Sequence, residues 1–203
     1  MDRRLKQPLV VLFMGVSGSG KTTLGSLLSK RIGGRFGDAD AFHPAANVEK
    51  MSNGIPLTDD DRWPWLDAIA ATIGRWAAGG TNVVFACSTL KRIYRDRLRT
   101  GRTDLTLIHL SGDEDLIARR MERRTGHFMP AGLLRSQLAT LEPPGPDEGA
   151  ITLNIGPPPE ILLAQCLARL RLDGPPSTGS GDSTARSRSG HHCVLVLLWF
   201  RSR

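Results

Sequence analysis

Short apolar runs alternate with longer amphipathic stretches along residues 1–172 of the chain. Apolar runs bounded by turn residues are typical of buried strands. We therefore expect about five strands, at Leu9–Met14, Arg35–Asp40, Asn82–Cys87, Leu105–Leu110 and, with a weaker pattern, Ala150–Asn154. Strands that alternate with helices predict right-handed βαβ units and a parallel sheet. The expected fold is therefore α/β in three layers, with a parallel sheet of about five strands flanked by helices.

The amphipathic stretches repeat apolar positions at helical spacing. They predict a helix that ends near Arg31, followed by helices at Trp63–Ala78, Ser88–Arg99, Glu114–Arg123, Leu133–Leu141 and Glu160–Leu172. The segment Ala41–Asp61 is expected to be irregular, because several Pro and Gly turn signals interrupt it.

The chain has 203 residues, of which 40% are hydrophobic, so we expect one domain with a buried core, at residues 1–172. The net charge is +7, but residues 173–203 carry four Arg and two Asp, so the domain holds only +5. This mild excess fits a pocket for anionic ligands, and we do not expect nucleic-acid binding. No signal peptide or membrane-spanning run is visible, so we expect a cytoplasmic protein without a membrane partner.

The composition changes after Leu172. Asp173–Gly181 is rich in Gly, Pro and Ser, and Ser/Arg-rich sequence continues to Gly190. The seven-residue apolar run at Val194–Phe200 is too short to cross a bilayer. We expect residues 173–203 to form a low-complexity, disordered tail.

The apolar run that ends at Met14 leads into the sequence GVSGSGKT, which matches the pattern G-x-x-x-x-G-K-[ST] at every fixed position. Glycines let the backbone curl so that successive N–H groups converge on phosphate oxygens, and the following helix presents its positive end. In such a loop Lys21 reaches the β- and γ-phosphates, and the Thr22 hydroxyl contacts Mg²⁺. The residues expected to bind ATP are Gly15, Ser17, Gly18, Ser19, Gly20, Lys21, Thr22 and Thr23.

Two carboxylates, Asp38 and Asp40, stand at the end of the second expected strand. Alternate residues of a strand point the same way. Both side chains are therefore expected to face one pocket beside the phosphate-binding loop GVSGSGKT, called the P-loop below. The third strand ends at Cys87-Ser88 without an acidic residue, so Asp38 is the natural second contact for Mg²⁺. Asp40 would then accept the proton of an attacking hydroxyl.

Further polar side chains follow these strands. His43 and Arg62 flank the acidic pair and offer donors for a polyhydroxylated or carboxylated substrate. Ser88 lies just beyond the third strand, while Lys91 and Arg95, four residues apart, are expected to share one face of the next helix.

A basic helix end runs into a Gly-containing loop between Arg119 and Phe128. This arrangement would suit a mobile lid, at about residues 120–140, that closes arginines over the transferring phosphoryl group.

With these motifs in place, the chain closely resembles the gluconokinases, P-loop kinases of small molecules that are related to shikimate and nucleoside monophosphate kinases. The resemblance runs from about Val10 to Leu170. The blocks that carry it lie at Met14–Thr23, Asp38–Met51, Gly54–Leu66, Cys87–Arg99 and Gly126–Pro144. Many NTPases share the first block, whereas the second, third and fourth together are specific.

The resemblance implies the P-loop kinase fold and the transfer of a phosphoryl group from ATP to the 6-hydroxyl of D-gluconate, with Mg²⁺, by a homodimer. By matching position, Asp40 would be the base and Asp38 a metal contact. The residues that would face gluconate are Asp40, His43, Arg62, Ser88, Lys91 and Gln137. Lys21 would act on the phosphates, and Arg120 and Arg124 would be arginines of the lid.

Two alternatives stay open at this point. The same scaffold could phosphorylate another small hydroxy acid, such as shikimate or another aldonate. The chain could also be a nucleotide-binding module without turnover, although a pure switch needs no base such as Asp40.

Overall fold

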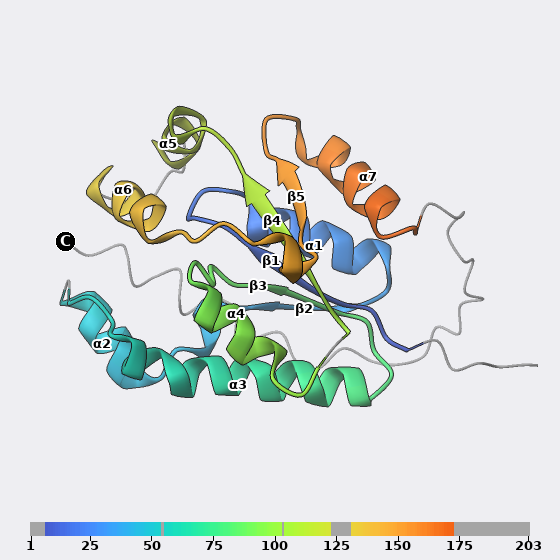
Figure 1. Ribbon diagram of the computed structural model, residues 1–203, viewed down its shortest axis with the longest axis horizontal. Helices are drawn as coiled ribbons and strands as arrows, with labels where there is room; N and C mark the ends of the chain where they lie inside the picture. Colours follow the sequence, from blue (N-terminus) through green and yellow to red (C-terminus); the bar gives the residue numbers. More distant parts are fainter. Residues whose placement is uncertain (1–6, 54, 103, 123–130, 173–203) are drawn as a thin grey trace, which may run out of the picture.

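The computed structural model describes residues 7–53, 55–102, 104–122 and 131–172. Its centre is a parallel sheet of five strands in the order β2-β3-β1-β4-β5 (Figure 1). The strands are β1 (Val10–Met14), β2 (Arg35–Asp38), β3 (Val83–Ala86), β4 (Leu105–Ser111) and β5 (Ile151–Asn154). Every pairing in the sheet is parallel. The predicted α/β fold with a parallel sheet is therefore confirmed.

Helices cover both faces of this sheet (Figure 1). On one face lie α1 (Lys21–Arg31) and α7 (Pro159–Arg169), and on the other α3 (Asp59–Ala78) and α4 (Arg92–Arg99). Three further helices gather at the end where the strands finish, namely α2 (Ala45–Ser52), α5 (Glu114–Glu122) and α6 (Ala131–Thr140). Two short 3-10 helices, η1 (Ala39–Phe42) and η2 (Pro146–Glu148), complete the described part.

The side chains of β1 show why the sheet sits between two layers of helices. Val10, Leu12 and Met14 belong to the core cluster under α3 and α4, whereas Val11 and Phe13 belong to the cluster under α1. All five are essentially inaccessible to solvent. A strand buried on both faces loses the alternation of apolar and polar residues, which explains its continuous apolar run.

The expectation of an irregular segment at residues 41–61 is wrong at both of its ends. Residues 45–52 form α2, which starts directly after Pro44. The His-Pro pair therefore marks the start of a helix, because proline at a helix start loses no intrahelical hydrogen bond. Helix α3 begins at Asp59 because Thr58 and Asp61 form a capping box.

Two other expected elements are shorter than the pattern suggested. Strand β2 ends at Asp38, and Asp40 lies in η1, so the two carboxylates are not on one strand. Helix α4 begins at Arg92 instead of Ser88, because Thr89 has a left-handed φ of 36°. Lys91 therefore precedes the helix, and the expectation that it shares a helical face with Arg95 is wrong.

Part of the expected lid, including Arg124, and the expected tail at residues 173–203 lie outside the described residues. None of the helices in the described part of the chain combines the length and the hydropathy needed to cross a membrane.

Candidate active site

A glycine-rich loop joins β1 to α1 at the end of the sheet where all the parallel strands finish. Gly15 in this loop has a φ of 140°, and a Cβ atom there would lie 2.7 Å from the carbonyl oxygen of Leu110. Only glycine fits such a position. Gly20 stands at the start of α1, and no side chain caps this end of the helix. The N–H groups of its first turn are therefore available to an anion.

Lys21 folds back over this loop. Its Nζ donates hydrogen bonds to the carbonyl oxygens of Gly15 and Val16, both at 2.9 Å. The hydroxyl of Ser19 is buried and has no hydrogen-bond partner among the described residues. A cavity of about 260 Å³ opens beside the loop and is lined by Gly18, Ser19, Gly20, Thr23, Leu24, Leu110, Arg120, Pro159 and Leu162. The loop thus combines N–H groups, a cation and an unused hydroxyl next to a space that a ligand can enter.

Asp38 lies beside the P-loop, as the sequence predicted. Its Oδ2 accepts a hydrogen bond from Thr22 Oγ1 at 2.8 Å, and its Oδ1 accepts one from the backbone N–H of Asp40 at 3.2 Å. Among the described residues, no group of three or more His, Cys, Asp or Glu side chains could hold a metal ion by itself. A hydroxyl and a carboxylate do fit Mg²⁺, which prefers oxygen ligands and completes its shell with phosphates and water.

Asp40 is placed next to this pair by η1, not by the strand. Burial among protein atoms raises its pKa, the nearby charge of Asp38 raises it further, and Lys21 partly offsets both effects. The side chain still has solvent access, so a hydroxyl can approach it. A carboxylate with a raised pKa is a stronger base than an ordinary aspartate.

A cluster of charged side chains lies where α3 and α4 begin. Asp59 accepts hydrogen bonds from Lys91 Nζ at 3.0 and 3.1 Å and from the Tyr94 hydroxyl at 2.5 Å. Arg62 lies 3.7 Å from the same carboxylate, and its guanidinium stands 5.6 Å from the Tyr94 ring centre. The Tyr94 and Lys91 hydrogen bonds lower the pKa of Asp59. Lys91 and Arg62 are thus brought together, and both already face a carboxylate.

His43 stacks on Trp65 with ring centres 4.3 Å apart and planes within 9° of parallel. Its Nδ1 is buried without a hydrogen-bond partner among the residues that the structure describes. Burial, and secondarily the charge of Arg62, lower the pKa of His43 to about 4. At neutral pH the ring is therefore uncharged, with one nitrogen that donates and one that accepts.

This lowered pKa gives a testable dependence of stability on pH. The pKa of an unfolded histidine is near 6.5. Between pH 6.5 and about 4, His43 is therefore protonated in the unfolded chain but not in the folded chain. We expect the free energy of unfolding to fall as the pH falls through this window. His43→Phe, which keeps a ring on Trp65, should make urea-denaturation curves less pH-dependent there. Burial also lowers the pKa of His109, so some dependence will remain. A pH dependence unaltered by His43→Phe would contradict the burial of an uncharged ring.

The other predicted site residues lie around the same end of the sheet. Gln137 on α6 accepts from the N–H of Ser17 at 2.7 Å and donates to its hydroxyl at 3.0 Å, so it lies against the P-loop. Arg120 on α5 lines the cavity and donates to the carbonyl oxygen of Ile155 at 2.6 Å. Ser88 follows β3, and its carbonyl oxygen accepts a hydrogen bond from the N–H of Gly15 at 3.4 Å.

Two residues of the charged cluster were missed by the sequence reasoning. Asp59 belongs to an acidic triplet in the first turn of α3, and Tyr94 lies within the basic helix α4. Their partners are 32 and 35 residues away along the chain, so no local pattern pairs them. The available signal was the density of charged side chains in the two blocks at residues 54–66 and 87–99.

Known proteins resemble this chain over most of its length. The sequence profile of a family described as an AAA domain matches residues 10–144. A gluconokinase of Gluconobacter oxydans is 44% identical over 167 residues, which cover 82% of this chain and 94% of that protein. The thermoresistant gluconokinase of Escherichia coli is 42% identical over 161 residues, covering 78% of this chain and 91% of that protein.

Solved structures give the same result. A gluconokinase from Sinorhizobium meliloti superposes with a TM-score of 0.73 at 44% identity, covering 81% of this chain and 93% of that one. The APS kinase of Mycobacterium tuberculosis, at 18% identity and a TM-score of 0.61, shares the fold alone.

Proposed function

The chain belongs to the gluconokinase family, and we propose that it transfers the γ-phosphoryl group of ATP to the 6-hydroxyl of D-gluconate. One observation carries the proposal. Three parts lie around the end of the sheet where the strands finish: a P-loop, a carboxylate with a raised pKa at Asp40, and the cations Lys91 and Arg62. A kinase for a sugar acid needs these three parts: a phosphate cradle, a base for the hydroxyl, and a charge for the carboxylate.

The nucleotide would bind across the P-loop, with its phosphates on the N–H groups at the start of α1. Lys21 would leave the carbonyl oxygens of Gly15 and Val16 to meet the β- and γ-phosphates. The cavity between the P-loop, Arg120 and the start of α7 would take the nucleoside. Arg120 would then approach the phosphates from the lid side, and Arg124 is proposed to act with it.

Thr22 and Asp38 are the residues that would hold Mg²⁺. When bound, the ion supplies positive charge that neutralises the phosphoryl oxygens. Asp38 has a second task that needs no metal, because its Oδ1 accepts the N–H of Asp40 and so fixes the backbone that carries the base.

Chemistry would then be an in-line displacement. The 6-hydroxyl oxygen forms a bond to the γ-phosphorus as the bond to the bridging oxygen of ADP breaks, and Asp40 takes the hydroxyl proton. Positioning of the two reactants would supply most of the rate.

The sugar acid would lie between Asp40 and the charged cluster. Its carboxylate would compete with Asp59 for Lys91 and Arg62, both of which keep some solvent access. His43, uncharged at neutral pH, would hydrogen-bond a hydroxyl group. Ser88 and Gln137 would complete the polar wall, and for Gln137 this requires leaving Ser17.

We also propose that the enzyme is a cytoplasmic homodimer. The family resemblance supports the dimer, and the cytoplasmic location rests on the sequence pattern alone. Light scattering of the purified chain measures its mass directly, and a monomer over the working concentration range would contradict the dimer.

The function is tested by measuring ADP release from Mg-ATP with D-gluconate, shikimate and other aldonates. We expect turnover well above background with D-gluconate and much slower turnover with the other acids. Turnover with another acid alone would keep the mechanism and change the substrate. Folded chain that binds ATP and turns over with none of the acids would identify a nucleotide-binding module.

A further inference from the structure

Two oppositely charged side chains, Arg95 on α4 and Glu148 at the end of η2, are paired inside the molecule. Arg95 Nε and one terminal nitrogen donate to the two carboxylate oxygens at 2.6 and 2.7 Å. Both side chains are only 1% exposed. Apolar residues of similar size are often as stabilising as a buried ion pair, so stability alone does not explain this one.

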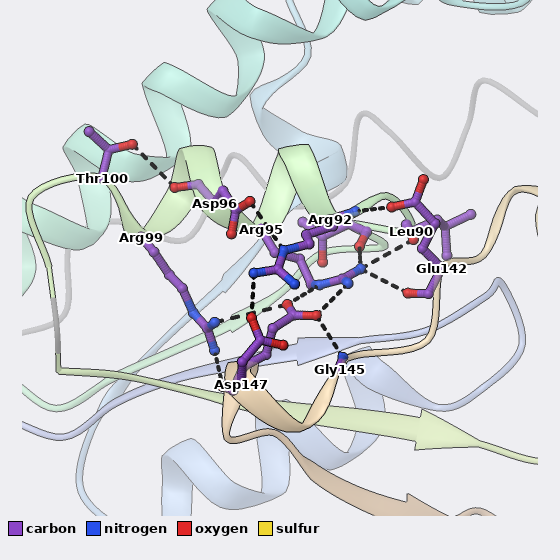
Figure 2. Close-up of polar contacts among 11 residues, drawn as sticks. Leu90, Arg92, Arg95, Asp96, Arg99, Thr100, Glu142, Gly145 and Asp147 are labelled. Carbon is purple, nitrogen blue, oxygen red and sulfur yellow. Dashed lines mark hydrogen bonds and ion pairs between the residues drawn. The ribbon is translucent and has the colours of Figure 1, made fainter.

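The remaining terminal nitrogen of Arg95 points into the loop between β3 and α4 (Figure 2). It donates to the carbonyl oxygens of Thr89 and Leu90, both at 3.2 Å, and to that of Glu142 at 3.0 Å. Thr89 has a φ of 36°, a conformation that β-branched residues strongly disfavour. Arg95 therefore binds the backbone of this loop at the residue whose backbone angle is the least favourable for its type.

The same loop is also tied to the segment that follows α6. The N–H of Glu142 donates to the Leu90 carbonyl oxygen at 2.8 Å, and Glu142 Oε2 accepts the N–H of Arg92 at 2.6 Å. Glu142 thus fixes both the loop and the start of α4.

Glu148 is held as firmly as its partner. Its Oε1 accepts the N–H of Gly145 at 2.9 Å, and its own carbonyl oxygen accepts a hydrogen bond from Arg99 at 2.7 Å. The guanidinium of Arg95 is therefore fixed in orientation, and the carbonyl groups that it binds are fixed with it.

We propose that the Arg95–Glu148 pair positions the substrate side of the active site by holding residues 88–91 in a turn in which Thr89 has a left-handed φ. This inference rests on the proposed function, because Ser88 and Lys91 at the two ends of that turn are the residues assigned to the sugar acid. The pair touches no substrate itself, so both members are positioning residues.

The test replaces the pair by apolar residues in the double variant Arg95→Met/Glu148→Leu, which leaves no buried charge behind. The matched control is Arg97→Gln/Asp67→Asn, since Arg97 on the same helix forms a two-bond pair with Asp67 at 2.6 and 2.8 Å, but at the surface. A further variant, Arg95→Lys, keeps the charge beside Glu148 and serves if the double variant does not fold.

We expect kcat/KM for gluconate to fall by about tenfold or more in the Arg95 variants, because small displacements of positioning groups have large kinetic effects. The KM for ATP should stay close to that of the original chain, and the control pair should change neither value. An unchanged kcat/KM for gluconate in folded variants would overturn the proposal. An equal rise in the KM for gluconate and the KM for ATP would also overturn it.

Hydrogen exchange gives a readout that needs no turnover. The amides of Arg92 and Glu142 report the contacts that hold the loop. They should exchange about tenfold faster or more in the Arg95 variants, while the amides of β3 keep their protection. Unchanged exchange at both amides overturns the positioning role even if gluconate proves not to be the substrate. Lack of gluconate turnover in the original chain, in contrast, overturns only the proposed function.

Discussion

Asp40→Asn is expected to lower kcat for gluconate phosphorylation by about 10³-fold, within the range for removing a positioned base. The amide cannot accept the proton of the attacking hydroxyl, but it keeps the size of the carboxylate. Nucleotide binding should change little, because the phosphates rest on the P-loop and Lys21. Initial rates and the ATP dissociation constant, measured on the same protein, separate the two effects.

Asp60→Asn is the control for this variant. Asp60 is an exposed acid in the first turn of α3, and we assign it no role in the site. Activity at the original level in Asp40→Asn would show that another group takes the proton. A loss of ATP binding as large as the loss of rate would show that Asp40 serves the nucleotide.

Glu148→Leu is expected to have the largest effect on stability. It leaves Arg95 as a buried charge without its counter-ion, which costs about 3–5 kcal/mol of the free energy of unfolding in known cases. Urea denaturation at neutral pH measures the loss. Arg97→Gln breaks a pair of the same kind at the surface, where solvent screens the charges and a much smaller loss is expected.

The contrast between these two variants carries the prediction. If both variants lost the same small part of the free energy of unfolding, water would have to reach Arg95 in the folded chain. The acid side of the stability curve gives a second check. Hydrogen bonds from Arg95 lower the pKa of Glu148, so its contribution is present above the ordinary value of 4.5 and is lost as the pH falls through the lowered pKa. Glu148→Leu should remove that part of the acid sensitivity.

The P-loop and the strands of the sheet could be predicted from the sequence because their signals are local. A continuous apolar run marks β1 as buried on both faces, and the glycines after it match one backbone shape. Asp38 was placed beside Thr22 by the rule that ligands gather where parallel strands end, and the two side chains are hydrogen-bonded.

The parts that could not be predicted depend on contacts between distant segments. The sequence predicts that Arg95 shares a helical face with Lys91, and only the approach of Glu148, 53 residues later, explains its burial. Asp59 has an ordinary local role at the start of α3, but Lys91 and Tyr94 are brought to it by the fold. Thr89 breaks the expected helix through a backbone angle that its residue type does not favour.

The most direct test of the account is the identity of the product formed from D-gluconate and Mg-ATP by the purified chain. Phosphorus and carbon NMR locate the new phosphoester on the carbon chain. The account predicts one product, phosphorylated on the 6-hydroxyl, and its absence with Asp40→Asn. A phosphoester on another hydroxyl, or hydrolysis of ATP without a phosphorylated acid, would contradict the arrangement of Asp40, Lys91 and the P-loop around gluconate.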